Sequence, residues 1–179
     1  QPKGYQLMVS DSGYSLELEE TLISAYISHR VCGIVLHNTQ HTDRTRNALK
    51  ASGIPCVETG NLHTHPIDMV VSYSNYKAGF AIASHLVSLG YKRIAFASLE
   101  VKHNDRLRER RRGFLAGLRK AGISIDPALI LVCESGLKNG GLALEKILQT
   151  DQNVQAVFFA GDVLAAGAIF ECQRRGISV

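Results

Sequence analysis

Length, charge and hydropathy exclude some classes of protein at the outset. The chain has 179 residues, which is enough to bury a core as one domain or as two small ones. No apolar run approaches the roughly 20 residues that a membrane-spanning helix needs, so we expect no membrane partner. The net charge of +4 permits nucleic acid or an acidic small molecule as a partner without choosing between them.

The cysteines bear on the compartment. They are scattered along the chain and form no C-x-x-C pair: Cys32, Cys56, Cys133 and Cys172. Most lie in or beside apolar runs, which favours buried, reduced thiols over disulfides. We therefore expect a cytoplasmic protein.

Helices and short apolar strands alternate along the chain. The first helix follows Ser15 and carries Glu17, Glu19 and Glu20 in its opening turns, where the positive helix end favours acidic side chains. Four further helices are each closed by a glycine, which supplies the left-handed cap that turns the chain back. They end before Gly53, Gly90, Gly122 and Gly176.

The strands indicate the fold class. They are continuous apolar runs, such as GIVL, RIAFA and AVFF, and do not alternate between apolar and polar residues. Such runs are typical of strands covered on both faces, as in parallel sheets with helices outside. The sequence therefore predicts an open, doubly wound α/β fold.

One stretch breaks this alternation. After the apolar run that ends at Glu58, a polar loop leads into the strand MVVSY with no helix in between. A strand that crosses in this way from one sheet towards another indicates a boundary between two lobes near Tyr73. We predict an N-terminal lobe over residues 1–73 and a C-terminal lobe over residues 74–179.

An arginine cluster opens the helix that follows the strand RIAFA. At about 100° per residue, Arg106 and Arg110 lie on one side of this helix, near a strand's carboxyl end. Open α/β sheets place ligand-binding groups there, and a guanidinium can hold a carboxylate or paired hydroxyls. Arg108, Arg111 and Arg112 are better explained as solvated residues that pair with neighbours.

Other candidates are weaker. Asp162 follows Gly161 at a strand-to-helix turn, where an N-cap for a helix beginning at the next residue is the simplest interpretation. His63 and His65 have the spacing of a metal pair, but no further ligands stand nearby, which favours loop histidines. His37 follows the strand GIVL, so a ligand contact and a surface loop are equally good interpretations.

Catalytic signatures are missing from the sequence. It contains no G-x-S-x-G, no phosphate-binding loop, no G-x-G-x-x-G after a strand and no metal-binding helix pair. We therefore predict no catalytic residue, no metal and no cofactor, although an α/β enzyme acting on a sugar acid stays an alternative.

Four stretches together resemble the effector-binding core of lactose/galactose-repressor (LacI/GalR) type transcription regulators. They are SHRVCGIVL, SNYKAGFAIASHLVSLGYKRIAF, RERRRGFLAGLRKAGI and the closing VFFAGDVLAAGAIFECQRRGISV. They run in the order and spacing of the family and, with their connections, cover nearly the whole chain. Within the family, PIDMVVSYSN and GAIFECQRRG look most like the gluconate- and idonate-responsive repressors.

The resemblance implies an architecture and partners. Two periplasmic-binding-protein-like lobes would bind a small-molecule effector, a sugar or sugar acid, in the cleft between them. The protein would be a homodimer that binds operator DNA through a helix-turn-helix headpiece, which is absent from this chain. The core itself would be incomplete at both ends. A periplasmic sugar-binding protein of the same architecture, serving transport, is the alternative.

The resemblance also assigns site residues. Arg110 matches the family arginine that grips the effector, and Arg106 occupies a neighbouring cleft position. His37 matches a contact position after GIVL, and Tyr73 lies at the first lobe crossover. Gly161 falls where many members carry an effector-contacting asparagine, with Asp162 beside it at the ligand edge.

Two further glycines replace typical effector contacts of the family. Gly60 falls where an aspartate often contacts sugar hydroxyls, and Gly136 where several members place a stacking aromatic ring. Losing the ring platform and an acidic contact while keeping two arginines suggests an open-chain acidic sugar as the effector. The chain is thus predicted to sense a gluconate-like ligand for a DNA-binding repressor and to lack enzymatic activity.

Overall fold

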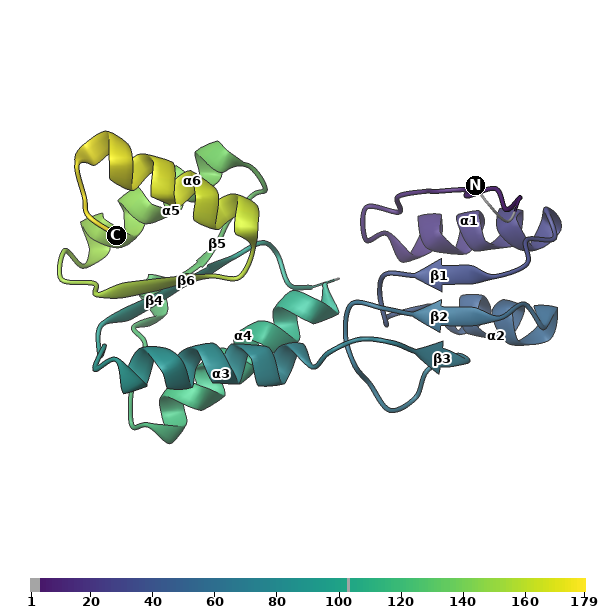
Figure 1. The fold of residues 1–179 in the computed structure, drawn as a ribbon, viewed down its shortest axis with the longest axis horizontal. Coiled ribbons are helices and arrows are strands. Elements are labelled where there is room, and N and C mark those ends of the chain that lie inside the picture. Colours follow the sequence, from purple (N-terminus) through teal and green to yellow (C-terminus); the bar gives the residue numbers. More distant parts are fainter. Residues whose placement is uncertain (1–3, 103) are drawn as a thin grey trace. The chain divides into compact units, whose positions relative to one another are not determined.

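A computed structural model describes residues 4–102 and 104–179 of the chain. It contains two compact units, one ending at Tyr73 and the other beginning at Ser74. Each unit is a parallel three-stranded sheet with helices packed on it (Figure 1). In the described part of the chain, no helix is both long and apolar enough to cross a membrane. The predicted α/β class with parallel sheets is confirmed.

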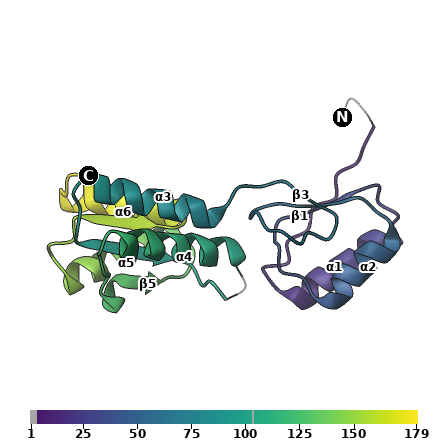
Figure 2. The same ribbon diagram turned by 90° about the horizontal axis from the view of Figure 1, so that it is seen from below.

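The N-terminal unit has the strand order β1-β2-β3. Its elements are α1 (Leu16–Ser28), β1 (Ile34–Leu36), α2 (Asp43–Ser52), β2 (Cys56–Glu58) and β3 (Met69–Val70). Both helices lie on the same side of the sheet (Figure 2), where Ile23 and Leu49 pack against strand residues. The side chain of Val35 points to the other face and is 72% exposed. The strand GIVL was expected to be covered on both faces, but in the described unit helices cover only one of them.

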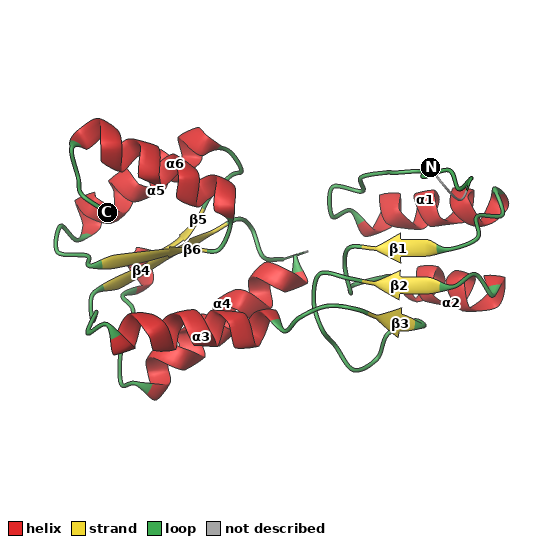
Figure 3. Cartoon of the chain, viewed as in Figure 1, coloured by secondary structure: helices red, strands yellow, loops and turns green. Residues whose placement is uncertain are grey.

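The C-terminal unit has the strand order β5-β4-β6. Its elements are α3 (Asn75–Ser88), β4 (Ile94–Ser98), α4 (Asp105–Lys120), a 3-10 turn (Pro127–Leu129), β5 (Ile130–Val132), α5 (Leu137–Thr150), β6 (Ala156–Phe159) and α6 (Asp162–Arg175). In Figure 3, α3 and α4 cover one face of this sheet and α5 and α6 the other. All of β4 is buried, as a central strand between two helical layers should be.

Aromatic packing fills the α3/α4 side of that sheet. The rings of Phe96, Phe114 and Phe158 contact one another with centroids 4.8–5.6 Å apart. Phe96 and Phe114 are fully buried, and Leu107 and Leu118 of α4 join the same core. The apolar side of α4 is thus the face that it turns to the sheet.

The two helix pairs of this unit approach through reciprocal glycines. A Cβ on Gly79 of α3 would lie 2.0 Å from the carbonyl oxygen of Arg110, and one on Gly113 of α4 would lie 1.9 Å from that of Tyr76. The same pattern joins α5 and α6 through Gly140 and Gly167. These helices therefore touch backbone to backbone, which only glycine permits.

Helix ends mostly follow the sequence signals. Ser15 is the N-cap of α1, and left-handed glycines, Gly53 and Gly176, cap α2 and α6. The prediction that Asp162 is an N-cap is wrong by one residue. Gly161 has the extended dihedral angles of the N-cap, so α6 begins at Asp162, whose Oδ1 accepts the Val163 amide at 2.9 Å. Asp162 still lies at the positive helix end.

The cysteines are all free thiols. Cys56 and Cys172 are buried and Cys133 is half-buried, but Cys32 is exposed. The prediction of a buried thiol is therefore wrong for Cys32, because it lies in the loop before β1 rather than in the strand.

The glycine contacts generate a stability prediction. Replacing Gly113 by alanine forces α3 and α4 apart, and we expect the free energy of unfolding to fall by about 3 kcal/mol, as for other overpacked interiors. Urea denaturation followed by circular dichroism measures the effect. Gly161→Ala is the control, because a Cβ there meets nothing within 4 Å. Equal midpoints for the two variants would contradict the backbone contact.

Candidate ligand-binding site

Each unit collects its candidate residues at one edge of its sheet. All strand pairs are parallel, so the carboxyl ends of the strands meet at the same edge. Open α/β sheets bind ligands at that edge. His37 follows β1 in the first unit, and Gly161 follows β6 in the second. The two edges are described separately below.

Arg110 is the most firmly positioned candidate of the C-terminal unit. Its Nε and Nη2 donate to Asn75 Oδ1, at 3.2 and 2.7 Å, and its Nη1 donates to the backbone oxygen of Ala160. Asn75 is fully buried at the start of α3. The half-buried guanidinium is therefore held between α3 and the residue before Gly161.

This arrangement leaves Arg110 able to bind an anion. A guanidinium has five N–H groups. Three are used by Asn75 and Ala160, so with respect to the described residues one on Nη1 and one on Nη2 remain. A charge fixed in one orientation, with unused donors at a sheet's carboxyl edge, can hold a carboxylate or a pair of hydroxyls.

Two other arginines of α4, Arg106 and Arg112, differ in their exposure to solvent. Arg106 is half-buried, one turn before Arg110. Arg112 is exposed, pairs with Glu109 at 2.8 Å and lies 4.9 Å over the ring of Tyr76. Arg112 thus has the solvated role expected for it.

The N-terminal unit orients His37 through a neighbouring strand. Its Nδ1 lies 2.9 Å from the hydroxyl oxygen of Thr59, which itself donates to the Leu36 carbonyl at 2.9 Å. Because that hydroxyl has one proton, His37 Nδ1 is the donor of the first pair. Tyr73 is exposed, and its carbonyl accepts the amide of Leu62 at 3.0 Å.

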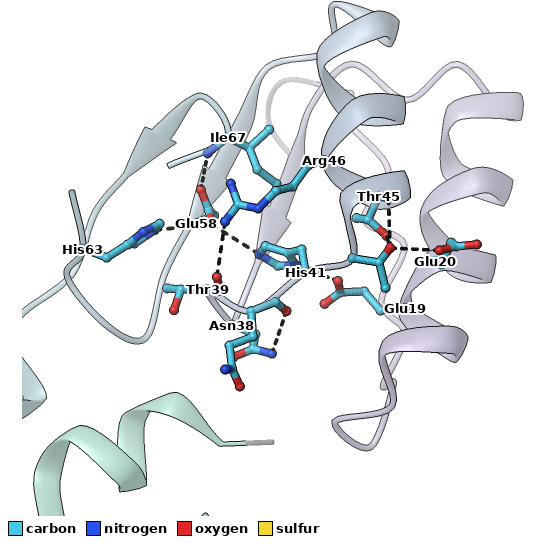
Figure 4. Close-up of polar contacts among 12 residues, drawn as sticks. Glu19, Glu20, Asn38, Thr39, His41, Thr45, Arg46, Glu58, His63 and Ile67 are labelled. Atoms are coloured by element: carbon cyan, nitrogen blue, oxygen red, sulfur yellow. Dashed lines mark hydrogen bonds and ion pairs between the residues drawn. The ribbon is translucent and has the colours of Figure 1, made fainter. Parts of the chain in front are cut away.

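The sequence did not predict a buried polar cluster that this unit contains (Figure 4). Glu58, the last residue of β2, is fully buried. Its Oε1 lies 3.3 Å from His41 Nε2 and 3.3 Å from His63 Nε2, and its Oε2 accepts the Ile67 amide at 2.6 Å. On its other side, His41 Nδ1 lies 2.6 Å from Glu19 Oε1.

The cluster corrects the interpretation of two sets of residues. Glu19 was expected only to favour the start of α1, yet it contacts His41. Of the loop histidines, His63 faces Glu58 whereas exposed His65 contacts Thr64 at 2.8 Å. Within the described residues no group of three His, Cys, Asp or Glu side chains is arranged to hold a metal ion. The sequence contained one indication of this cluster, a glutamate at the end of an apolar strand. A charged residue in such a position needs partners, because charged side chains are almost never fully buried without them.

The cluster makes its surroundings acidic. Burial, and then the negative charges of Glu58, Asp68 and Glu19, raise the pKa of the Cys56 thiol to about 11. Asp68 itself accepts the Cys56 amide at 3.0 Å. Cationic partners for the carboxylates are therefore expected nearby.

Paired parallel α/β units with polar groups at their carboxyl edges define a small-molecule-binding architecture. Residues 2–179 match the family of periplasmic binding proteins and sugar binding domain of LacI family. The chain belongs to this family, and the resemblance noted in the sequence is confirmed.

Individual proteins similar to this chain are transcriptional regulators. The chain is 34% identical to the HTH-type transcriptional regulator GntR of Pseudomonas aeruginosa, over 99% of this chain and 52% of that protein. A LacI family regulator from Silicibacter pomeroyi has a similar structure, with TM-score 0.92 and 28% identity over 98% of this chain and 53% of that one. The transcription regulator GntR from Chromobacterium violaceum gives TM-score 0.89 and 30% identity, over 99% of this chain and 65% of that one. The chain spans about half the length of the curated relatives it matches.

The Cys56 environment generates a reactivity prediction. At pH 8 its thiolate fraction should be about a hundredfold below that of an ordinary thiol, because the pKa is raised from 9.0 to about 11. Exposed Cys32 should therefore be alkylated first, as mass spectrometry of the folded protein can show. Equal rates at Cys32 and Cys56 would contradict it.

The raised pKa of Cys56 also determines how its contribution to the free energy of unfolding depends on pH. The unfolded thiol loses its proton near pH 9.0, whereas the folded thiol keeps it until about pH 11. The stabilising contribution of Cys56 is present below the first value and is lost as the pH rises towards the second.

Proposed function

We propose that this chain is the effector-sensing domain of a DNA-binding transcriptional repressor and binds a small sugar or sugar acid, gluconate-like in its chemistry. Family membership and regulators among its relatives support the class of protein. The observation that carries the ligand proposal is the orientation of Arg110, with unused N–H groups at the carboxyl edge of its sheet.

The proposed mechanism is that of a ligand-shifted equilibrium. In the family arrangement the effector binds between two such lobes, and we propose the same for the units on either side of Tyr73. A ligand acts only through its different affinity for two arrangements of the lobes. That shift would alter how a homodimer presents its headpieces to operator DNA in the cytoplasm.

The ligand proposal rests on complementary charge. Arg110 supplies a fixed cation, Arg106 a second basic group one turn away, and His37 and Tyr73 polar contacts from the other unit. Gly161 has no side chain, so the backbone beside Asp162 is accessible to a ligand. A carboxylate with flanking hydroxyls suits this set better than a neutral sugar ring, which needs a stacking surface.

Arg110 provides the first test of the proposal. In a chain extended to the full length of its relatives, Arg110→Ala should weaken gluconate binding at least tenfold, because a charge-assisted pair contributes about 1.5–3 kcal/mol. Isothermal calorimetry measures the affinity. Arg112→Ala, on the solvent side of the same helix, is the control. Unchanged affinity in the Arg110 variant, or tight binding of a neutral sugar with none of gluconate, would overturn the assignment.

A second surface supports the homodimer within this proposal. Leu142 of α5 and Phe170 of α6 are 49% and 56% exposed, and they border a groove of about 390 Å³ between the two helices. Lys138, Glu145 and Arg174 also line that groove. An apolar centre with a charged rim is the composition of a subunit interface.

The interface yields its own prediction. Phe170→Glu should place a charge in the centre of the apolar surface and shift the extended protein from dimer to monomer, as analytical ultracentrifugation can measure. Leu89→Glu is the matched control, because Leu89 is an equally exposed apolar residue at the end of α3. A dimer that survives the Phe170 change would show that α6 is not the contact.

The periplasmic sugar-binding protein stays the alternative function. It shares the family and would bind similar ligands. Operator binding by the extended protein, measured by fluorescence anisotropy with and without gluconate, separates the two. A protein that binds the sugar acid but never DNA would be a transport component.

A further inference from the structure

The connection between β2 and β3 contains no helix. The two strands are parallel neighbours, joined by residues 59–68 without any regular element. Parallel strands are normally connected through a helix that packs on the sheet and fixes the crossover. Another interaction must hold this loop, because loops not fixed by packing are the least stable parts of a fold.

Glu58 supplies three points of attachment. Its Oε2 accepts the amide of Ile67 at 2.6 Å, near the end of the loop. Its Oε1 faces His63, in the middle of the same loop, at 3.3 Å. The same oxygen faces His41, in the loop after β1, at 3.3 Å. One carboxylate therefore contacts both loops at the carboxyl edge of this sheet (Figure 4).

Burial makes these contacts matter for Glu58. Glu58 is fully buried, and a buried carboxylate is very costly unless it is paired. Within the described residues its Oε1 forms no hydrogen bond, and neither does Nε2 of His41 or of His63, so the two imidazoles lie against this oxygen at ion-pair distance. His41 has carboxylates at both ring nitrogens, 2.6 Å from Glu19 and 3.3 Å from Glu58.

The other charged groups around the cluster have different partners. Glu20 of α1 accepts from Thr42 at 2.8 Å and pairs with Arg44 of α2 at 3.0 Å. Arg46 of α2 donates to the backbone carbonyls of Thr39 and His65. Among the described residues, the side chain of Glu58 thus contacts histidines and a backbone amide rather than an arginine or lysine.

The cluster adjoins a candidate binding residue. Thr59 directly follows Glu58 and accepts the hydrogen bond from His37 Nδ1, while its own hydroxyl donates to Leu36. Movement of the loop after β2 would therefore move the partner that orients His37.

We propose that Glu58 is the positioning residue of this binding edge, holding the loops after β1 and β2 together through the Ile67 amide and through His41 and His63. The effect on ligand affinity rests on the proposed function, because His37 matters only if the ligand binds at this edge. The effect on the loops themselves does not, and it can be measured without any ligand.

The central experiment is Glu58→Gln, which keeps the shape of the side chain and removes its charge. Amide hydrogen exchange should become at least tenfold faster in residues 37–41 and 59–67 and stay unchanged in α3–β6. Glu17→Gln, which removes an exposed carboxylate of the same unit, is the control and should change neither region. Unchanged exchange in residues 59–67 of a folded Glu58 variant would overturn the proposal.

Histidine variants keep the test valid if Glu58→Gln does not fold. His63 and His65 lie in the same loop, but only His63 faces Glu58. His63→Gln should speed exchange in residues 59–67, whereas His65→Gln should not; equal effects would contradict the assignment.

Ligand binding then separates the two proposals. In the extended chain, Glu58→Gln should weaken gluconate binding about tenfold as measured by calorimetry. If the unchanged protein binds no sugar acid, the proposed function fails while the exchange result still stands. If it binds gluconate and the variant binds equally well, the positioning role fails and the proposed function stands.

Discussion

Backbone contact between α3 and α4 is the constraint on which the arrangement of the C-terminal unit depends. With glycine at positions 79 and 113, each helix accepts the other's carbonyl where a Cβ would lie about 2 Å from it. This contact fixes the rotation of α4 about its axis. One side of α4 then packs Phe114 on the sheet, and the adjacent side directs Arg110 towards Asn75. Packing and the orientation of the arginine therefore have the same origin.

The two units position their candidate binding residues through different interactions. In the C-terminal unit, helices cover both faces of the sheet, and apolar packing positions the elements around Arg110. In the N-terminal unit the described helices cover one face, and the β2–β3 connection has no helix. There the buried carboxylate of Glu58 contacts histidines from two loops and connects them. Charge pairs of this kind are weak evidence for stability but are demanding in geometry, which suits a role in positioning loops.

Local patterns were sufficient to predict the elements. Apolar runs and glycine caps depend on neighbouring residues, so the strand-helix order, the helix-free loop before β3 and the parallel α/β class could all be derived from the sequence. The errors have local causes as well: Asp162 was misplaced by one residue because Gly161 takes the extended N-cap conformation. Cys32 was expected to be buried because it lies beside the apolar run GIVL, but the strand begins only at Ile34.

Contacts between residues far apart in the sequence could not be predicted from such local patterns. Arg110 is separated by 35 residues from Asn75 and by 50 from Ala160, and no periodicity connects those positions. His41 and Glu19 are 22 residues apart and come together only because α1 packs beside the loop after β1. His63 looked like an ordinary loop histidine, because a buried carboxylate partner cannot be recognised from sequence spacing. Side-chain chemistry could be read residue by residue, whereas the pairing of charges required the fold.

The distribution of basic groups also bears on the partner that this part of the chain recognises. A helix that reads a DNA groove presents its arginines on one face to many phosphates and base edges. On α4, Arg112 is occupied by Glu109 and Tyr76 at the surface, while Arg110 is fixed by a buried asparagine and a backbone carbonyl. A single immobilised guanidinium with two remaining N–H groups matches one small anion, because each remaining donor must find an acceptor at a defined point. The fixed guanidinium of Arg110 therefore fits the proposed small anion better than it fits a DNA groove.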